Sequence, residues 1–235
     1  MAEPKQDNST DVPLPAMLFD LDGTLVDSVY EHVRAWHETF TNFRMDIPSW
    51  KIHRRIGMSG AFFLPKLLRE IGHSANRSTI DRLERKRAKY FEKEIKQIRV
   101  MSGAPELLMR LTKIGLPWAI ATSGQRSQTK KLIRGLHVPA SVPVVTGDDV
   151  KNAKPAPDIF LLAAEKLNVS ISGSIVVGDS PWDLLAGRRM KALGVGLLCG
   201  GYPKEELERA GAHLVYENPG ELLENLAELG IRETN

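Results

Sequence analysis

Residues Phe19–Ser28 read FDLDGTLVDS and place two aspartates, Asp20 and Asp22, directly after a short apolar run. The run Met17–Phe19 has the character of a buried strand, and Gly23–Thr24 is typical of the turn that ends one. Both carboxylates can therefore lie on the same side of the strand's exit. Such a pair can hold a hard cation, and one carboxylate can also act as a nucleophile. A solvated turn with two surface aspartates is the weaker interpretation, because the pattern extends over the whole stretch.

Short apolar, β-branched runs alternate with helix-like segments along much of the chain. This alternation predicts an α/β fold, a Rossmann-like doubly wound parallel sheet with helices on both faces. The predicted strands are 16–19, 118–121, 142–146, 174–178, 195–198 and 213–216, and the predicted helices are 105–114, 125–135, 156–167, 182–192, 203–210 and 220–228. Ligands in such sheets bind beyond the carboxyl ends of the strands. The residues that this rule places along one rim are Asp20, Thr122, Asp148 and Asp179.

The interval 29–98 interrupts the alternation and predicts an all-helical cap domain inserted after the first strand. Its first apolar face consists of Val29, Val33, Trp36, Phe40 and Phe43, which recur at helical spacing. This stripe favours a packed core over a ligand-binding surface. Residues 62–71 and 80–98 also have helical character. The expected division is a flexible tail (1–13), an α/β catalytic core (14–28 and 99–235) and the helical cap (29–98).

The charge is unevenly distributed along the 235-residue chain, whose net charge is +3. Residues 28–98 hold fifteen Lys and Arg against eight Asp and Glu, a balance of +7 that leaves −4 for the rest. A solvated helix face, as in Arg82–Arg87, explains most of these charges. Steering of an anionic substrate toward a cleft is the functional alternative. Nucleic-acid binding is the weakest account, because no nucleic-acid fold signature accompanies the charge.

Composition also bears on the compartment. The single cysteine, Cys199, cannot form an internal disulfide, which fits a reducing compartment. No apolar stretch approaches the length of about 18 residues that a membrane span needs, and residues 1–13 lack the apolar segment of a signal peptide. We therefore expect a cytoplasmic protein with no membrane span. The oligomeric state stays open, since no heptad seam is present.

A second motif, Ala121–Gly124 (ATSG), follows the predicted strand 118–121. A hydroxyl and backbone amides at a strand-to-helix junction suit a phosphate cradle, although Ser and Thr also simply cap helices. The third motif is KPAPDIF, headed by Lys154. A lysine beside a nucleophile can screen its charge and stabilise phosphoryl oxygens, and the prolines favour a helix start.

The fourth motif is GDSPWD at Gly178–Asp183, after the predicted strand 174–178. Ser180 as N-cap and Pro181 as first helical residue make a good helix start. Asp179 then projects from the strand end toward the cation site of Asp20. We expect Asp183, about one turn further on, to orient Asp179 or a metal-bound water. The candidate ligands are carboxylates, which suit Mg²⁺, and the sequence has no Cys/His cluster that would favour zinc.

These four motifs, in this order, resemble those of the haloacid dehalogenase superfamily over about residues 17–229. The resemblance is closest to capped members such as phosphoglycolate phosphatase and β-phosphoglucomutase. It implies a Mg²⁺-dependent phosphatase that hydrolyses a small phosphate monoester, phosphoglycolate-like or sugar-phosphate-like, through an aspartyl-phosphate intermediate. Its partner is then a small phosphorylated metabolite.

The resemblance also implies a role for each motif residue. Asp20 becomes the nucleophile, and Asp22 the general acid and then the general base. The residues assigned to phosphate binding are Thr122, Ser123, Gly124 and Lys154. Those assigned to Mg²⁺ are Asp20, Asp22 (through its backbone carbonyl) and Asp179.

Other activities of the superfamily are less well matched. Its carbon–halogen hydrolases typically lack the second aspartate, which this chain has as Asp22. β-Phosphoglucomutase, the main alternative, carries a lysine and an arginine in the cap loop where this chain has Ile56 and Gly60. It also carries a glutamate where this chain has Gly178. A non-enzymatic, nucleic-acid-associated protein is a remote alternative, because a degenerate site would be expected to lose at least one motif residue.

Three residues of the interval 29–98 are candidates for substrate specificity. His32 lies where the mutase has a hinge histidine near its acid/base, and a surface histidine is the alternative. Arg54 or Arg55 is suited to pair with a carboxylate or second phosphate on the substrate. A surface basic turn is an equally good interpretation of those two arginines.

Overall fold

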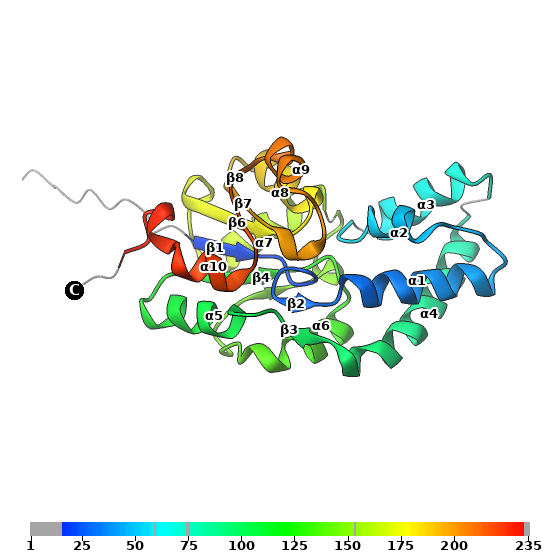
Figure 1. The fold of residues 1–235 in the computed structure, drawn as a ribbon, viewed down its shortest axis with the longest axis horizontal. Coiled ribbons are helices and arrows are strands. Elements are labelled where there is room, and N and C mark those ends of the chain that lie inside the picture. The colour runs from blue at the N-terminus through cyan, green and yellow to red at the C-terminus, as the bar shows by residue number, and fades with distance from the viewer. Residues whose placement is uncertain (1–15, 59, 74–75, 153, 233–235) are drawn as a thin grey trace, which may run out of the picture.

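The computed structural model describes residues 16–58, 60–73, 76–152 and 154–232, so the predicted tail 1–13 lies outside the described residues. One six-stranded sheet has the order β5-β4-β1-β6-β7-β8, and all its neighbours pair in parallel (Figure 1). The strands are β1 (Ala16–Phe19), β4 (Trp118–Ala121), β5 (Val144–Val145), β6 (Ser174–Gly178), β7 (Leu193–Leu197) and β8 (Ala212–Tyr216). The predicted fold class is confirmed.

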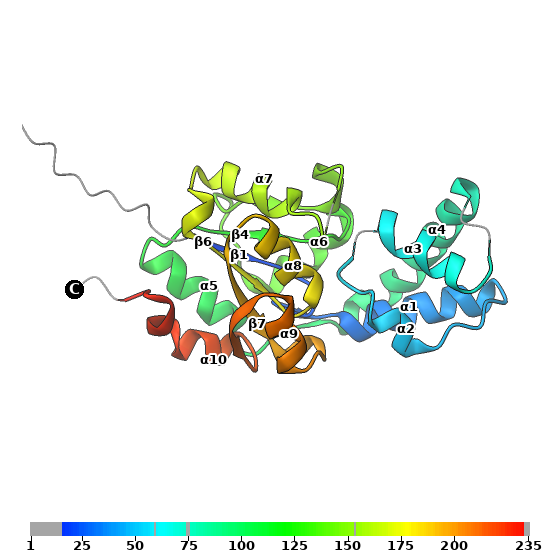
Figure 2. The same ribbon diagram turned by 90° about the horizontal axis from the view of Figure 1, so that it is seen from above.

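Helices cover both faces of this sheet, as Figure 2 shows. They are α5 (Ala104–Lys113), α6 (Arg126–Leu132), α7 (Asp158–Leu167), α8 (Pro181–Arg189), α9 (Lys204–Ala210) and α10 (Pro219–Glu224). Side chains alternate between faces along β1. Met17 and Phe19 belong to the hydrophobic cluster that includes α5 and α10, whereas Leu18 packs with α7 and α8. Short 3-10 helices occupy Ile95–Gln97, Ile133–Leu136, Gly147–Asp149, Ile171–Gly173, Leu198–Gly200 and Leu226–Leu229.

Between β1 and α5, the described residues form four α-helices. They are α1 (Val29–Asn42), α2 (Ser49–His53), α3 (Gly60–Glu70) and α4 (Arg77–Glu94). They share a hydrophobic cluster of their own, which contains the predicted stripe residues Val33, Trp36 and Phe40. We call residues 29–98 the helical segment. Its last long helix begins three residues before the predicted 80–98 because Asn76 caps it, with Oδ1 accepting a hydrogen bond from the amide of Thr79 at 2.9 Å.

Two short strands that the sequence did not reveal connect the helical segment to the sheet. β2 (Val26–Asp27) and β3 (Arg99–Val100) pair antiparallel, with Val26 opposite Val100 and Asp27 opposite Arg99. Their two residues each are too few to show an alternating pattern. The chain therefore leaves and re-enters the core through one paired ribbon.

The strand predicted at 142–146 is shorter than expected. Thr146 leaves the strand to form a capping box with Asp149, which begins the 3-10 helix Gly147–Asp149. Asp148 does not join the other rim residues, since its Oδ2 accepts a hydrogen bond from the amide of Arg126 at the start of α6, at 2.8 Å.

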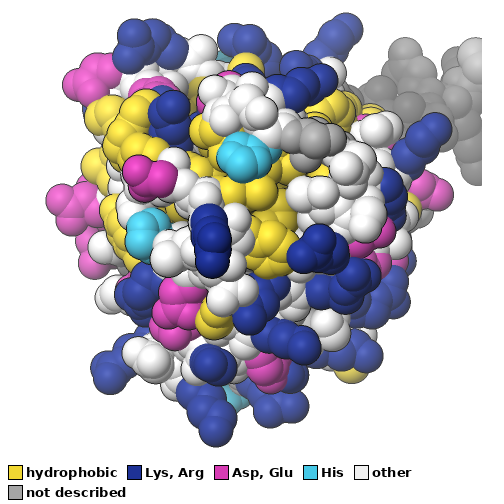
Figure 3. All heavy atoms as spheres, turned by 90° about the vertical axis from the view of Figure 1, so that its right-hand side faces the viewer, with side chains coloured by type: hydrophobic (Ala, Val, Ile, Leu, Met, Phe, Trp, Pro, Cys, Tyr) yellow, Lys and Arg dark blue, Asp and Glu magenta, His cyan; other side chains and the backbone are white. Residues whose placement is uncertain are grey.

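Basic side chains crowd the end of the molecule that the helical segment forms (Figure 3). Exposed examples on α4 are Arg82, Arg85, Lys89 and Lys93. This agrees with the surplus of positive charge in residues 28–98. Within the described ranges, no helix has the length and apolar character needed to cross a bilayer.

Candidate active site

Asp20 is the residue directly after β1, and strand pairing fixes its backbone. Its amide donates to the carbonyl of Val177 on β6 at 2.9 Å. Lys154 Nζ donates to Asp20 Oδ1 and also lies 2.7 Å from Asp183 Oδ1. The lysine side chain is 0% exposed. Burial alone would lower the pKa of Lys154, but the carboxylates of Asp183 and Asp20 raise it above its usual value, so the lysine is protonated.

Three buried carboxylates meet around this lysine. One oxygen each from Asp20, Asp179 and Asp183 lies within 4.8 Å of the other two, an arrangement able to hold a metal ion. Thr24 Oγ1 donates to Asp179 Oδ1 at 2.8 Å. Burial and mutual repulsion raise the pKa values of Asp179 and Asp20, because one ammonium group offsets only part of the negative charge. A hard divalent cation with oxygen ligands, such as Mg²⁺, fits this donor set.

Asp183 makes contacts beyond the orienting role expected of it, and that role stays a prediction. It forms a capping box at the start of α8, where its Oδ2 accepts hydrogen bonds from the amide of Ser180 at 3.2 Å and from Ser180 Oγ at 2.5 Å. Its other oxygen faces Lys154. The structure therefore shows Asp183 fixing the helix start and the lysine.

Asp22 lies in a different environment from Asp20. Its Oδ1 accepts hydrogen bonds from Ser28 Oγ at 2.6 Å and from His32 Nε2 at 3.0 Å, and its Oδ2 accepts one from Thr122 Oγ1 at 3.1 Å. Burial alone would raise the pKa of Asp22, but His32, with help from the two hydroxyls, lowers it to about 2. Asp22 is therefore ionised, and Nε2 of His32 carries the shared proton.

The second motif lies where the neighbouring strand β4 ends. Thr122 Oγ1 accepts a hydrogen bond from the amide of Gly124 at 3.0 Å while donating to Asp22. Ser123 Oγ points toward the helical segment and donates to the carbonyl of Gly57 at 3.0 Å. Thr122 is thus placed at the carboxylates, whereas the Ser123 side chain joins the core to the helical segment.

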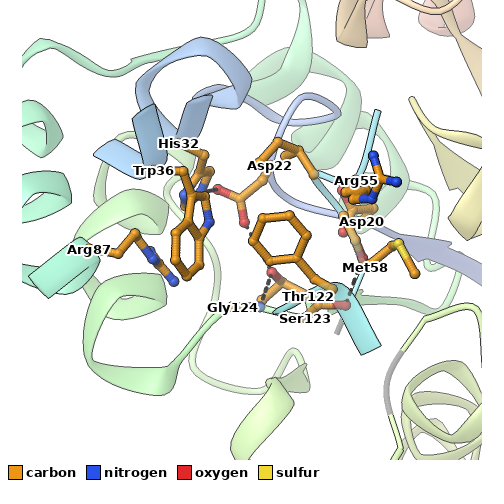
Figure 4. Close-up of a pocket in the computed structure, with 13 residues that line it drawn as sticks. Asp20, Asp22, His32, Trp36, Arg55, Met58, Arg87, Thr122, Ser123 and Gly124 are labelled. Carbon is orange, nitrogen blue, oxygen red and sulfur yellow. Dashed lines mark hydrogen bonds and ion pairs between the residues drawn. The ribbon is translucent and has the colours of Figure 1, made fainter. Parts of the chain in front are cut away.

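A cavity of about 90 Å³ opens onto these groups (Figure 4). In Figure 4, His32, Trp36 and Arg87 stand on one side of it, and Arg55 and Met58 on the other. The lining residues are Asp20, Asp22, His32, Trp36, Arg55, Ile56, Gly57, Met58, Phe63, Arg87, Thr122, Ser123 and Gly124. The core contributes the carboxylates and the second motif, and the helical segment contributes the remainder.

The three predicted specificity residues lie in different surroundings in the structure. His32 contacts Asp22, and its ring stacks on Phe91 with centroids 3.9 Å apart. Arg55 lines the cavity, although its Nη2 is paired with both oxygens of Glu70 at 2.7 and 2.6 Å. Arg54 does not line the cavity, because its guanidinium pairs instead with Glu206 on α9.

Sequence reasoning did not place Trp36, Met58 or Phe63 at the cavity, and it missed the contacts of Thr24, Ser28 and Arg87. Thr24 and Ser28 lie inside the decisive stretch, so their positions were visible but their partners were not. Arg87 was taken as part of a solvated face, and that interpretation is wrong for this residue. Its Nε is buried, and its guanidinium lies 5.5 Å from the ring centroids of both Trp36 and Phe91. A signal did exist, since Arg87 falls four residues after Leu83 and four before Phe91, on the apolar face of α4.

Comparison with known proteins agrees with this arrangement. The profile of the haloacid dehalogenase-like hydrolase family matches residues 14–191. Hexitol phosphatase A of Escherichia coli (strain K12) is 36% identical over 178 residues, covering 72% of this chain and 76% of the relative. Phosphoglycolate phosphatase of Rhodospirillum rubrum is 26% identical over 210 residues, covering 86% and 87%. A solved hydrolase from Pseudomonas syringae is 47% identical with a TM-score of 0.88, covering 91% of this chain and 98% of that one.

The chain belongs to the haloacid dehalogenase-like hydrolase family. The predicted family and enzyme class are confirmed. The roles of individual residues, the metal and the substrate are proposals.

Proposed function

We propose that this protein is a Mg²⁺-dependent phosphatase that hydrolyses a small phosphate monoester, with Asp20 as nucleophile and Asp22 as general acid and base. The observation that supports this most strongly is the difference between the surroundings of the two carboxylates. Asp20 lies against Lys154 in the acidic cluster, whereas Asp22 receives hydrogen bonds from Ser28, His32 and Thr122 at the cavity. Two carboxylates with such different environments suit two different roles.

Mg²⁺ would be held by Asp20, Asp179 and the backbone carbonyl of Asp22. When bound, it would neutralise charge on the phosphoryl oxygens. The protein contributes the remaining positive charge. Lys154 would stabilise the phosphoryl group beside the nucleophile, and Thr122 and the amides after it would complete the cradle. Asp183 would keep Lys154 in place through their 2.7 Å ion pair.

In the first step, an Asp20 oxygen attacks phosphorus in line and the bond from phosphorus to the leaving oxygen breaks. The leaving alkoxide takes the proton that Asp22 and His32 share across their 3.0 Å contact. In the second step, Asp22 accepts a proton from water as the water oxygen attacks phosphorus. The bond to Asp20 then breaks, phosphate leaves, and the Asp22–His32 pair regains its proton.

The substrate is proposed to be a phosphorylated small metabolite, sugar-phosphate-like or phosphoglycolate-like. Two relatives are named as phosphatases of a hexitol phosphate and of phosphoglycolate. The cavity of about 90 Å³ is far below the size of about 300 Å³ at which drug-sized sites begin. Arg55 and Arg87 bring positive charge to it, and Trp36 and Phe63 bring apolar surface. We further propose that residues 29–98 act as the cap that excludes water, and that the protein is cytoplasmic.

A β-phosphoglucomutase-type mutase is the second candidate, because His32 contacts the proposed acid/base Asp22. Two observations favour hydrolysis. Ile56, which stands where the mutase has a charged residue, lines the cavity. A Cβ at Gly178 would lie 2.5 Å from Asp183 Cγ, so the site has no room for the mutase glutamate.

The test is phosphate release with Mg²⁺ from a panel of sugar, polyol and carboxylic-acid phosphates. Asp20→Asn and EDTA should each abolish release. Asp148→Asn is the matched control, because Asp148 also follows a strand but lies outside the acidic cluster and should keep activity. Isomerisation of a sugar phosphate without net phosphate release would identify a mutase. Absence of both reactions from the whole panel would refute the proposal.

A further inference from the structure

The helical segment contacts the core through a group of side chains beside α2, separate from the cavity lining. His53, the last residue of α2, has its Nε2 2.9 Å from the carbonyl oxygen of Gly200. Because a carbonyl can only accept, Nε2 is the protonated nitrogen. The His53 ring stacks on Tyr30, at 5.5 Å between centroids, and on Tyr202, at 5.2 Å. The hydrogen bond to Gly200 and the contact with Tyr202 thus fix His53 against the loop after β7, whereas Tyr30, a residue of α1, packs on His53 from within the helical segment.

An ion pair extends this contact toward α9. Arg54 Nη1 donates to Glu206 Oε2 at 2.7 Å, and Nη2 donates to Oε1, so the guanidinium and carboxylate pair at two points. The same guanidinium lies 4.8 Å from the centroid of the Tyr202 ring. The side chains are 43% and 23% exposed, so salt and solvent weaken the pair, but its two-point geometry fixes the register of α2 on the core.

The loop that receives His53 also touches Asp179. A Cβ at Gly200 would lie 2.5 Å from Asp179 Cγ and 2.6 Å from Asp179 Cβ, so the backbone runs directly against the carboxylate. Gly201 has φ +85°, and a Cβ there would lie 3.2 Å from His53 Nε2. The backbone of Gly200 therefore contacts the His53 imidazole through its carbonyl and lies directly against Asp179 at its α-carbon. A shift of this backbone must move one or both.

We infer that His53 and Arg54 are positioning residues that tie closure of the helical segment to the placement of Asp179. When α2 rests on the core, His53 holds the Gly200 carbonyl and Arg54 holds α9, which keeps the loop pressed against Asp179. When α2 lifts away, the loop loses these contacts and Asp179 loses its support. Divalent-cation binding and closure then favour each other. The inference rests on the proposed function in that Asp179 is taken as a metal ligand.

The test uses the full chain with His53→Ala, Arg54→Glu, Glu206→Arg and the double exchange Arg54→Glu/Glu206→Arg. Arg77→Glu is the matched control, since Arg77 pairs with Asp81 inside α4 at 2.9 Å. Mg²⁺ affinity is measured by the shift of the thermal unfolding midpoint with Mg²⁺ concentration. Amide hydrogen exchange of residues 198–201 is measured without substrate. The Mg²⁺ concentration for half-maximal phosphate release is the third readout.

We expect each single change at the contact to weaken Mg²⁺ binding roughly three- to tenfold, the range of one lost hydrogen bond or ion pair, and to speed exchange at 198–201. The double exchange should restore both to within about twofold of wild type, because it rebuilds the pair with reversed sign. Arg77→Glu should change neither.

Unaltered Mg²⁺ affinity and exchange in His53→Ala and Arg54→Glu would overturn the inference, as would a double exchange no better than its single parents. A wild type that releases no phosphate from any ester would refute the proposed function instead. The binding and exchange readouts would still decide whether the contact supports Asp179.

Discussion

Replacing Gly200 with alanine should disable the candidate metal site while leaving the fold intact. The added methyl would overlap Asp179 Oδ2 and lie 2.5 Å from Asp179 Cγ, whereas ordinary contact begins at 3.4 Å, so the carboxylate must retreat by at least about 0.9 Å. The backbone itself tolerates alanine, because Gly200 is not among the glycines with positive φ. The strain therefore falls on Asp179.

The structure allows the size of this effect to be estimated. A displacement of about 1 Å at a group that positions reacting atoms costs roughly 10²-fold in rate, which corresponds to about 2.7 kcal/mol in the barrier. Overpacking costs about 1–3 kcal/mol of stability, and the loss of glycine's freedom in the unfolded chain returns about 0.4–1 kcal/mol. We therefore expect kcat/KM to fall about a hundredfold with a loss of stability no greater than about 2.6 kcal/mol.

The assay compares kcat/KM, the Mg²⁺ concentration for half-maximal activity and urea unfolding of Gly200→Ala with those of wild type. Gly196→Ala is the matched control, because its methyl would make its tightest contacts with the apolar side chains of Leu207, at 3.1 Å, and Val215, at 3.3 Å, and not with a carboxylate. It should lose some stability and keep kcat/KM. If Gly200→Ala kept kcat/KM within about threefold of wild type, the close packing of Gly200 on Asp179 or the metal role of Asp179 would be wrong.

Three further predictions concern metal, pH and thiol chemistry. Mg²⁺ at a hundred times its Kd should raise the free energy of unfolding of the wild type by about 2.7 kcal/mol, as measured by thermal unfolding. Mg²⁺ should not stabilise Asp179→Asn, and it should stabilise Asp148→Asn as much as the wild type. His32, Ser28 and Thr122 together lower the pKa of Asp22 to about 2, so Ser28→Ala, which removes one of these donors, should cost about 1–2 kcal/mol of stability above the ordinary pKa of 3.8. In urea unfolding across pH, that cost should shrink as pH falls toward 2, and a gap independent of pH would contradict the assignment. Burial raises the pKa of Cys199 to about 12, so very little of this thiol is the reactive thiolate at pH 8. Iodoacetamide should therefore modify Cys199 in the native protein roughly a thousandfold more slowly than it modifies an exposed thiol. Rapid alkylation of the native protein would contradict this prediction.

The sequence was sufficient to predict which strand ends hold the residues of the candidate site. Asp20, Thr122 and Asp179 each follow a fully buried apolar strand, and β1 lies between β4 and β6 in the sheet. In a parallel sheet the carboxyl ends of neighbouring strands meet at one edge, so a pattern read along the chain translates into proximity in space. The local pattern of apolar residues was therefore enough to predict the part of the site that the α/β core contributes.

The half of the site contributed by the helical segment could not be predicted in the same way. Periodicity reports which face of a helix is buried, but not which partner it meets. Arg54 pairs with Glu206, 152 positions away, while its neighbour Arg55 turns to the cavity and Glu70. The two arginines have the same chemistry, and only the packing of α2 on the core separates them.

The surroundings of Asp22 also restrict the order of proton transfers. With three donors and a pKa lowered to about 2, Asp22 is a carboxylate before substrate binds, so its proposed part as general acid depends on a proton that a neighbouring group supplies. A first step that needs an acid must therefore draw its proton from the hydrogen bond with His32 or from the bound phosphate monoester, whose second pKa is near 6. His32 is fixed for this exchange by stacking on Phe91, a residue of α4. The proposed acid half of the chemistry thus depends on the helical segment, whereas the proposed nucleophile Asp20, Lys154 and the acidic cluster belong to the α/β core.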